Sequence, residues 1–319
     1  MNLPTDASAP NWLAPAGPAA AEIAALSWGV LIAGTVLYLI VLGLLGWVVW
    51  RTGRTVSAGV SERVAGWFIG AGALVTGLVV TLLLVLSLQS LAGVLPSAAP
   101  AAVTIEITGH QWWWAARYPS ASADDTVETA NEIHIPVGQR VAVRLLSRDV
   151  IHSFWVPQLQ GKLDLIPGKV NVTWLQADRP GIYRGLCAEY CGLQHALMGF
   201  LIVAQPSAEF DAWLRQQRKP AAEPVDDLGR QGQRLFLDRG CAFCHTVRGT
   251  TAFFGRDGPD LTHVASRRTL AAATLTNVSG HLAGWVANPQ ALKPGNRMPQ
   301  VPLPPAEFHA VLRYLQGLH

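Results

Sequence analysis

The residues with the most specific chemistry are the cysteines and methionines, which are few and unevenly placed. The four cysteines form two pairs, Cys187 with Cys191 and Cys241 with Cys244. These pairs leave no cysteine for a wider disulfide framework. Apart from the initiator, the methionines are Met198 and Met298. Each lies where a soft sulfur ligand is expected, so the sulfur-containing residues predict metal chemistry.

The first cysteine pair begins a run of candidate ligands, C-A-E-Y-C-G-L-Q-H-A-L-M, at residues 187–198. An ordinary blue copper site needs one cysteine, two histidines and a weak axial methionine, and this run has one cysteine more. Two thiolates four residues apart can instead bridge two copper ions, each completed by one imidazole and one weak ligand. His152 and His195 are the candidate imidazoles, while Met198 and a backbone carbonyl between the cysteines are the candidate weak ligands.

The second cysteine pair lies in C-A-F-C-H at residues 241–245, which has the spacing of a c-type haem attachment motif. The two thiols would add to the haem vinyl groups, and His245 follows directly, where it can reach the iron. Met298, in the late segment K-P-G-N-R-M-P, is the methionine available as the sixth ligand. Ligation by histidine and methionine raises the potential of a haem, which suits an electron carrier.

Each cysteine pair also has a simpler interpretation. The first could form a disulfide, with His152 and His195 as incidental surface residues, but a disulfide leaves the run of ligand types unexplained. The second could be a redox dithiol or half of a zinc site, but the adjacent histidine and the lack of another C-x-x-C pair disfavour both. Four further histidines compete as haem ligands, and their spacing predicts solvent-exposed residues instead: His263, His281, His309 and His319.

Two long apolar segments precede these motifs. The first has no charged residue from Ile23 to Trp50, and the second is most apolar from about Val64 to Leu91. Each exceeds the roughly 20 residues that span a bilayer, so both are predicted transmembrane helices. A cleaved signal peptide is the alternative for the first segment, but a basic n-region is lacking and the apolar run is too long for an h-region.

The charges around these segments predict their orientation. The connection between them contains three arginines and one glutamate: Arg51, Arg54, Arg63 and Glu62. Residues 1–22 contain Asp6 and Glu22 but no lysine or arginine. Because positive charge favours the cytoplasmic side, the connection is predicted to be cytoplasmic. Both termini and everything after about Leu91 are then expected in the bacterial periplasm.

The first soluble region, from Val103 to Ala204, has the pattern of an all-β domain. Short runs such as VTIEITGH, NEIHIPVGQRVAVRLLS, KVNVTWLQ and GFLIVA are separated by glycine and proline. Within one run, apolar residues at 141, 143 and 145 alternate with arginines at 140 and 144, as in a half-buried strand. The copper ligands fall in the late loops of this sandwich.

A second soluble region follows a helix, SAEFDAWLRQQ, and a linker, RKPAAEPVDD. The predicted organisation is an N-terminal periplasmic segment (1–22), a two-helix anchor (23–92), the β domain (93–205), the helix and linker (206–226) and a haem domain (227–319). Half of the 319 residues are apolar and 14% are charged, which is typical of a membrane component. A net charge of +3 without a basic run excludes nucleic-acid binding.

Four segments in this order closely resemble subunit II of the haem-copper cytochrome c oxidases, over roughly residues 20–205: GHQWWW, DVIHSFWVP, KLDLIPGKVN and RPGIYRGLCAEYCGLQHALMG. The resemblance implies a two-helix hairpin and a cupredoxin-like Greek-key sandwich. It also implies a binuclear copper centre, CuA, in which Cys187 and Cys191 bridge both ions. One copper would be completed by His152 and Met198, the other by His195 and the Glu189 carbonyl.

The same resemblance assigns roles to three further positions. The Glu189 side chain would reach a magnesium or manganese ion shared with subunit I. Trp112 would be the residue that receives electrons above the copper, although clustered tryptophans more often serve packing or subunit contact. Family members carry a glutamate near the start of the second helix that helps admit protons. Val64 occupies that position here, so proton uptake through this chain is not expected.

The C-terminal region resembles small single-haem, all-α class I cytochromes c. Gly232 and Phe236 with Tyr314 would form the helix crossing of that family, and the Pro259 carbonyl would orient His245. A cytochrome c joined to a subunit II implies an oxidase variant in which the soluble donor is fused to its acceptor, at high effective concentration.

The resemblance therefore implies the electron-transfer subunit of a cytochrome c oxidase. Electrons from a cytochrome c or a cytochrome bc complex would pass through haem c and CuA to subunit I, where oxygen is reduced to water and protons are translocated. Subunits I and III are the expected partners. A CuA-containing denitrification reductase is the nearest alternative. A quinol oxidase would lack the copper ligands, and a redox sensor or copper-handling protein would not need the hairpin.

Overall fold

The structure is a computed structural model of the whole chain, and it describes residues 7–8, 10–52, 61–95, 101–122, 125–252 and 254–319. The chain divides into two units, residues 21–95 and the remainder formed by residues 1–20 and 96–319. The first unit is the helical anchor. The second contains the β-sandwich and the haem domain.

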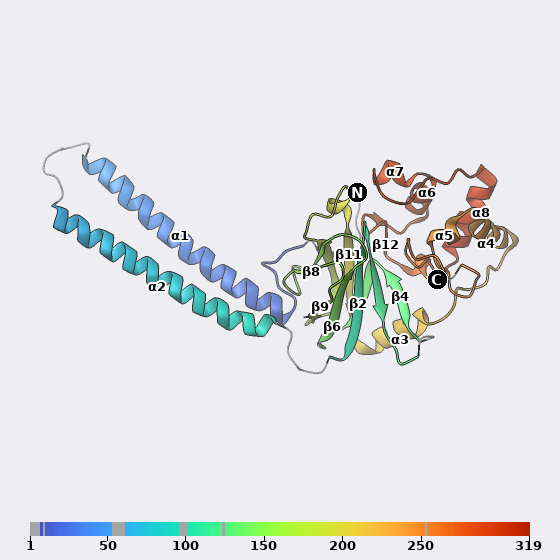
Figure 1. Cartoon of the computed structure of the whole chain (residues 1–319), viewed down its shortest axis with the longest axis horizontal. Coiled ribbons are helices and arrows are strands. Elements are labelled where there is room, and N and C mark those ends of the chain that lie inside the picture. The colour runs from blue at the N-terminus through green and yellow to red at the C-terminus, as the bar shows by residue number, and fades with distance from the viewer. Residues whose placement is uncertain (1–6, 9, 53–60, 96–100, 123–124, 253) are drawn as a thin grey trace. The chain divides into compact units, whose positions relative to one another are not determined.

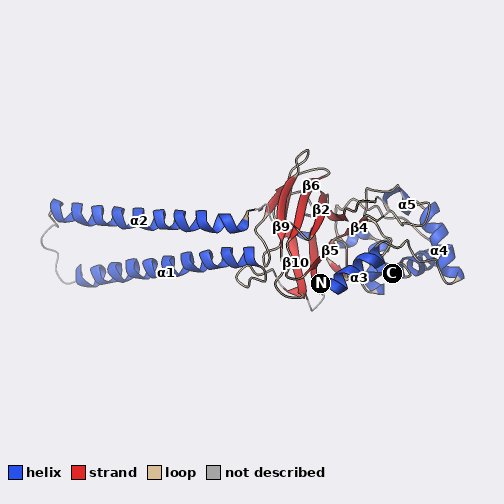
Figure 2. Cartoon of the chain, turned by 90° about the horizontal axis from the view of Figure 1, so that it is seen from below, coloured by secondary structure: helices blue, strands red, loops and turns tan. Residues whose placement is uncertain are grey.

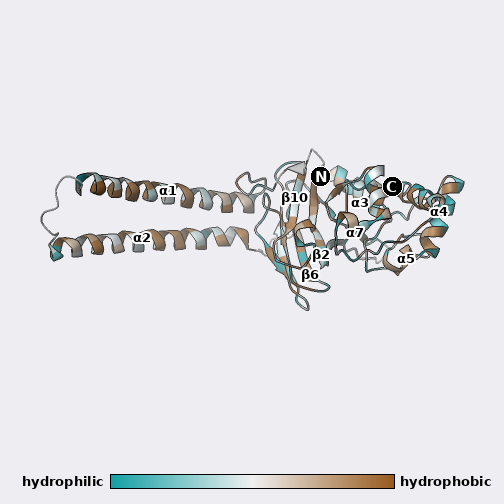
Figure 3. Ribbon diagram, turned by 90° about the horizontal axis from the view of Figure 1, so that it is seen from above, coloured by the Kyte–Doolittle hydropathy of each residue, from teal (hydrophilic) through white to brown (hydrophobic). Residues whose placement is uncertain are grey.

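The anchor consists of two long helices, α1 (Pro18–Thr52) and α2 (Glu62–Val94). They run alongside each other (Figure 1) and are apolar along most of their length (Figure 3). Both are long and apolar enough to cross a membrane, as the sequence predicts. Arg54, part of the predicted cytoplasmic connection, lies outside the described residues. Val64 lies in the first turn of α2, two residues after Glu62.

The β domain is a sandwich of two sheets (Figure 2). One sheet has the order β4-β3-β2-β6-β9, built from Val127–Ala130, Trp113–Tyr118, Val103–His110, Val141–Ser147 and Asn171–Leu175. The other has the order β5-β11-β10-β7-β8, built from Glu132–Pro136, Gly199–Gln205, Gly181–Cys187, His152–Trp155 and Leu163–Leu165. This architecture confirms the predicted cupredoxin-like sandwich.

The core of the sandwich lies between the sheets and follows the strand alternation. In β6, Val141, Val143 and Leu145 are buried, while Arg144 is exposed. Trp114, the last residue of the tryptophan run, also lies in this core, where it is fully buried against Phe154 and Phe200. Burying side chains of this size is the main source of stability for such a domain.

The N-terminal segment is also part of the sandwich. The sequence predicted a separate periplasmic segment there and did not indicate that it packs into the β domain. Strand β1 (Ala7–Ser8) pairs in parallel with β10. Ala16 is buried in the core, where its N–H donates to the Gln158 carbonyl at 2.7 Å and its own carbonyl accepts from the Asp178 N–H at 2.8 Å. Residues on both sides of the anchor therefore build one domain.

After the sandwich, α3 (Ser207–Gln217) leads into a helical domain. Its helices are α4 (Asp227–Asp238), α5 (Cys241–Cys244), α6 (Ser279–Ala287), α7 (Pro289–Leu292) and α8 (Pro305–Gln316). Short 3-10 turns occur at His195–Leu197 and Val264–Ser266, and the two-residue strands β12 (Thr269–Leu270) and β13 (Leu275–Thr276) pair with each other. This part confirms the predicted all-α cytochrome c class.

Helices α4 and α8 cross where the sequence places a glycine. A Cβ on Gly232 would lie 1.9 Å from the Ala310 carbonyl oxygen, so no larger residue fits without movement. The crossing is closed by Phe236 against Tyr314, whose ring centroids are 5.7 Å apart. Asp226 caps the start of α4 by accepting from the Gly229 N–H at 2.7 Å.

One expectation about this domain is wrong. His263 was predicted to be solvent-exposed, but only 2% of it is accessible. Its Nδ1 lies 2.7 Å from the His319 carbonyl oxygen and its Nε2 lies 3.0 Å from the Lys219 carbonyl oxygen. A buried imidazole with a partner at each nitrogen has a structural role, because it ties the chain end to the linker. His309 and His319 are exposed as predicted, whereas His281 is half-buried, with its Nδ1 2.8 Å from the Thr276 Oγ1.

Candidate copper and haem sites

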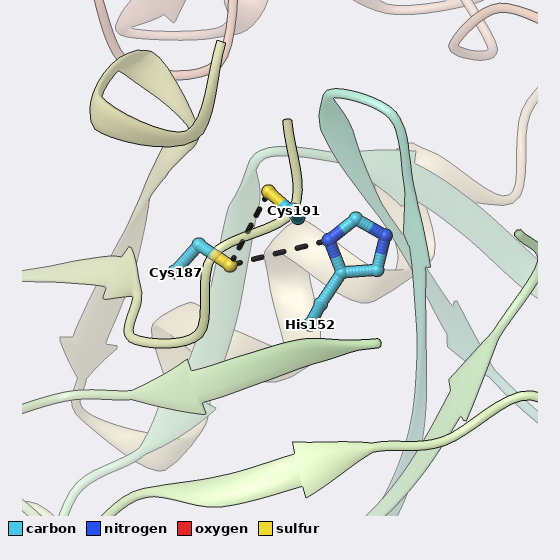
Figure 4. A group of neighbouring side chains, drawn as sticks. All are labelled: His152, Cys187 and Cys191. Atoms are coloured by element: carbon cyan, nitrogen blue, oxygen red, sulfur yellow. Dashed lines mark hydrogen bonds between the residues drawn. The ribbon is translucent and has the colours of Figure 1, made fainter. Parts of the chain in front are cut away.

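The first cluster forms where the start of β7 meets the loop between β10 and β11. Cys187 ends β10, His152 begins β7, and the remaining candidates follow in the loop before β11. The Sγ atoms of Cys187 and Cys191 are 3.8 Å apart, and the Cys191 Sγ is 3.7 Å from the Met198 Sδ. Both cysteines are free thiols. Figure 4 shows their sulfurs and the His152 ring facing one another.

The nitrogen and oxygen donors complete this cluster. His152 Nδ1 lies 4.0 Å from the Cys187 Sγ, and His195 Nδ1 lies 3.6 Å from the Cys191 Sγ. The Glu189 carbonyl oxygen is 3.2 Å from the Cys187 Sγ. The structure thus brings together all six groups that the sequence singles out.

Burial and electrostatics prepare this cluster to bind a soft metal. His152, both cysteines and Met198 are each at most 3% accessible. The hydrogen bond between the two thiols lowers the pKa of Cys187, and together with burial it raises the pKa of Cys191. Two sulfurs, two imidazoles, a thioether and a carbonyl fit copper, because soft ligands of this kind select it.

Asp149 orients one of the imidazoles. Its Oδ1 accepts a hydrogen bond from His152 Nε2 at 2.8 Å, which leaves Nδ1 free to face the sulfurs. Burial alone would raise the pKa of Asp149, but hydrogen bonds from His152 and from two backbone N–H groups lower it to about 2. The Asp149 carboxylate is therefore ionised at neutral pH, and it can accept hydrogen bonds but cannot donate one. Sequence reasoning missed Asp149, although its position three residues before His152 was the available signal.

The Glu189 side chain is exposed and outside the cluster. Among the described residues, the His, Cys, Asp and Glu side chains grouped closely enough to hold a metal are His152, Cys187 and Cys191. The magnesium or manganese role of Glu189 stays a prediction.

The second site is a cavity of about 790 Å³ in the same unit. Cys241, Cys244, His245 and Met298 line it, as the haem motif predicts. Its walls also include a stretch of the sandwich from His110 to Trp113. A largely apolar cavity of this size, with two thiols and two axial candidates at its wall, fits a covalently attached haem.

Local contacts position both axial candidates. His245 Nδ1 donates to the Pro259 carbonyl at 2.8 Å, the contact that the resemblance implies, and this leaves Nε2 for a metal. Burial lowers the pKa of His245, which keeps the imidazole neutral. The Met298 N–H donates to the Asn296 Oδ1 at 2.8 Å, and the Met298 carbonyl accepts from Gln290 Nε2 at 2.9 Å.

Two family models match the chain in these two regions. The model described as "Cytochrome C oxidase subunit II, periplasmic domain" matches residues 103–205, and the model "Cytochrome c" matches residues 230–319. The chain belongs to the cytochrome c oxidase subunit II family and carries a cytochrome c domain. The first match implies copper and the second implies haem.

Curated relatives agree with this assignment. The chain is 39% identical over 224 residues to cytochrome c oxidase subunit 2 of Alkalihalophilus pseudofirmus, and the match covers 70% of this chain and 63% of the relative. It is 32% identical over 227 residues to that of Bacillus subtilis and 31% identical over 228 residues to that of Bacillus sp. strain PS3, each covering 68% of this chain and 62% of the relative. The matches thus span less than two thirds of these relatives.

Two residues of the chain contact both candidate sites. Gln111 Nε2 and Trp112 Nε1 both donate to the Cys191 carbonyl, at 2.8 Å and 2.9 Å. Gly192 permits this approach, because it has φ +114° and a Cβ there would lie 2.9 Å from the Trp112 ring. Trp113 instead stacks on His110, with ring centroids 4.2 Å apart. Gln111 was not predicted as a site residue.

Proposed function

We propose that this subunit II carries electrons from a donor through its own c-type haem and a binuclear CuA centre to the haem-copper subunit I, where oxygen is reduced to water with proton translocation. One observation carries this proposal. Gln111 and Trp112 line the cavity suited to haem and also donate to the carbonyl of Cys191, a candidate copper ligand. The two candidate redox sites thus share a wall.

The proposed ligands are the groups that the resemblance implies and that lie close together in the structure. Cys187 and Cys191 would bridge two coppers, with His152 and Met198 on one and His195 and the Glu189 carbonyl on the other. A second set would hold the haem: Cys241 and Cys244 through thioether bonds, and His245 and Met298 on the iron. When bound, these groups supply one-electron redox chemistry.

The chain itself would keep this chemistry fast by limiting rearrangement. Four of the proposed copper ligands, His152, Cys187, Cys191 and Met198, are buried. Asp149 fixes the orientation of His152, and Pro259 fixes that of His245. Sites held this firmly need little reorganisation when charge changes, and they exclude water. Trp112 is the proposed route between the sites, because its indole contacts one site and lines the other.

The anchor supports a place in a membrane complex. We assign both helices as transmembrane, with both termini and the metal domains in the periplasm, following the arginines of the connection. Subunits I and III would be the partners in the membrane, and a cytochrome c or a cytochrome bc complex would be the donor. The exposed Glu189 side chain is free to reach a magnesium or manganese ion shared with subunit I.

Purification of the whole complex tests this function. We expect two coppers and one covalent haem in this chain, with cyanide-sensitive oxygen uptake by the complex. C187S and the double variant C241S/C244S should lose copper and covalent haem attachment respectively, while each retains the other group. Copper-free native protein, or reduction of a nitrogen oxide in place of oxygen, would contradict the proposal.

A further inference from the structure

Three consecutive alanines between β12 and β13 have a left-handed backbone. Ala271, Ala272 and Ala273 have φ angles of 53°, 58° and 54°. Residues other than glycine, asparagine and aspartate rarely adopt this conformation, because Cβ approaches the following carbonyl oxygen. Such a conformation persists only where its surroundings stabilise it. We call residues 271–273 the alanine turn.

Each carbonyl of the alanine turn accepts a hydrogen bond from a different donor. The Ala272 carbonyl accepts from the Gly199 N–H at 3.1 Å, and the Ala273 carbonyl accepts from Arg184 Nη1 at 3.3 Å. Both donors belong to the sandwich, in β11 and β10, the strands that flank the copper-ligand loop. The turn is therefore stabilised by the copper domain, although it is part of the haem domain.

The third carbonyl, that of Ala271, accepts from Lys293 Nζ at 3.1 Å. The same ammonium donates to the Leu197 carbonyl at 2.8 Å, one residue before the copper candidate Met198. Only 2% of Lys293 is accessible, and in the part of the chain that the structure describes no carboxylate forms an ion pair with it. A buried ammonium needs hydrogen-bond partners, and here the partners come from both domains.

We propose that the alanine turn and Lys293 form a latch that docks the haem domain onto the copper-ligand loop, and that Lys293 is a positioning residue for electron transfer between them. In that transfer one electron leaves the haem iron, which is oxidised, and reduces the copper pair by one electron. The claim that the latch serves electron transfer rests on the proposed function. The claim that the latch docks the two domains is independent of that function, because docking can be measured without electron flow.

Amide hydrogen exchange on the purified oxidase complex tests the latch, with the Gly199 amide as the reporter of docking. Removing the ammonium with K293M eliminates two hydrogen bonds to a charged group, and each is worth about a factor of ten or more. We expect the protection of the Gly199 amide to fall at least about tenfold. The exposed Lys219 provides the matched control, and K219M should leave the protection of the Gly199 amide unchanged.

A second pair of variants tests the turn itself. Ala271 is half-buried, so a larger side chain has some room there. A271V places a β-branched residue at positive φ and should weaken docking, whereas A271G removes the unfavourable Cβ and should preserve or strengthen it. Equal Gly199 exchange in A271V and A271G would overturn the role of the alanine turn.

Two further measurements are needed. One shows whether the haem domain of the variant is folded, and the other shows whether docking affects electron transfer. Intact methionine ligation of the haem, seen by its charge-transfer absorption, shows that the haem domain of K293M is folded. Flash-induced electron transfer from haem to copper should slow in K293M, because the weakened latch no longer holds the haem domain in one position against the copper-ligand loop. Unchanged Gly199 exchange in folded K293M overturns the latch. Faster exchange with an unchanged transfer rate overturns the positioning role of Lys293.

Discussion

Single residues around the copper cluster divide into those that can bind metal and those that align the binders. Asp149 belongs to the second kind, because it contacts His152 Nε2 rather than facing the sulfurs. Its low pKa means that the aligning carboxylate keeps its charge across the physiological range. Such partners of metal-bound histidines commonly determine affinity as strongly as a weak ligand does.

Replacing this carboxylate should weaken copper binding without removing a ligand. We expect D149N to lower the copper affinity of the site by about 10- to 100-fold, because an amide no longer fixes the orientation and tautomer of His152. Competition with a copper chelator measures the change. D211N, on the exposed side of α3, is the matched control and should bind as the native protein does. Native affinity in D149N would show that His152 is aligned by packing alone.

Sequence reasoning reached the candidate ligands but missed the residues that act through them. The run from Cys187 to Met198 is recognisable because its donors lie within twelve positions. Gln111 reaches Cys191 from 80 residues away, and only the folded sandwich brings them together. The error at His263 has the same origin, since its partners at Lys219 and His319 are distant in sequence.

Elements position the haem site through one close helix crossing. Helices α4 and α8 meet at Gly232, where no Cβ fits, and their contact fixes the wall of the haem cavity at Phe236 and Val311. The family resemblance made these helices predictable, and the alternation of apolar and polar residues did the same for the strands β2 and β6. The short pieces that build the latch, β12 and the alanine turn, follow no periodicity and were not predicted.

Adding one methyl group at the crossing should destabilise the haem domain. G232A places a Cβ 1.9 Å from the Ala310 carbonyl oxygen, so the helices must separate, at a cost of about 1–3 kcal/mol. G280A is the matched control, because a Cβ there meets nothing within 4 Å and alanine favours the helix. Thermal unfolding followed by haem absorbance should show a lower Tm for G232A only. Equal Tm values would mean that the crossing is less tight than described.

At the scale of the whole molecule, the two metal-binding domains also meet at a buried carboxylate. Glu132 on β5 accepts from the Arg268 N–H of the haem domain at 2.8 Å and lies 3.1 Å from His134 Nε2. Burial alone would raise the pKa of Glu132, but these hydrogen bonds and the nearby positive charge lower it. Docking of the haem domain on the sandwich therefore depends on the negative charge of Glu132 as well as on the fit of the two surfaces.

This lowered pKa predicts a loss of stability in acid. A carboxylate whose pKa is lower in the folded state stabilises the fold above its ordinary value of 4.5, and this stabilisation is lost as pH falls through the lowered value. Near neutral pH we expect the Tm of E132Q to lie about 2–4 °C below that of the native protein. This difference should shrink as the pH falls through the acidic range. Calorimetry measures it, with the exposed E223Q as control. A difference independent of pH would assign the effect to packing.

The burial of Ala16 in the sandwich has a consequence for biogenesis. Ala16 and β1 are synthesised before either membrane helix, whereas their partners at Gln158 and Ile182 leave the ribosome more than 140 residues later. In the proposed transmembrane orientation, the sandwich would therefore close only after both helices are inserted and the later strands have been exported. The proposed copper ligands lie between His152 and Met198, so they would come together at the same late stage.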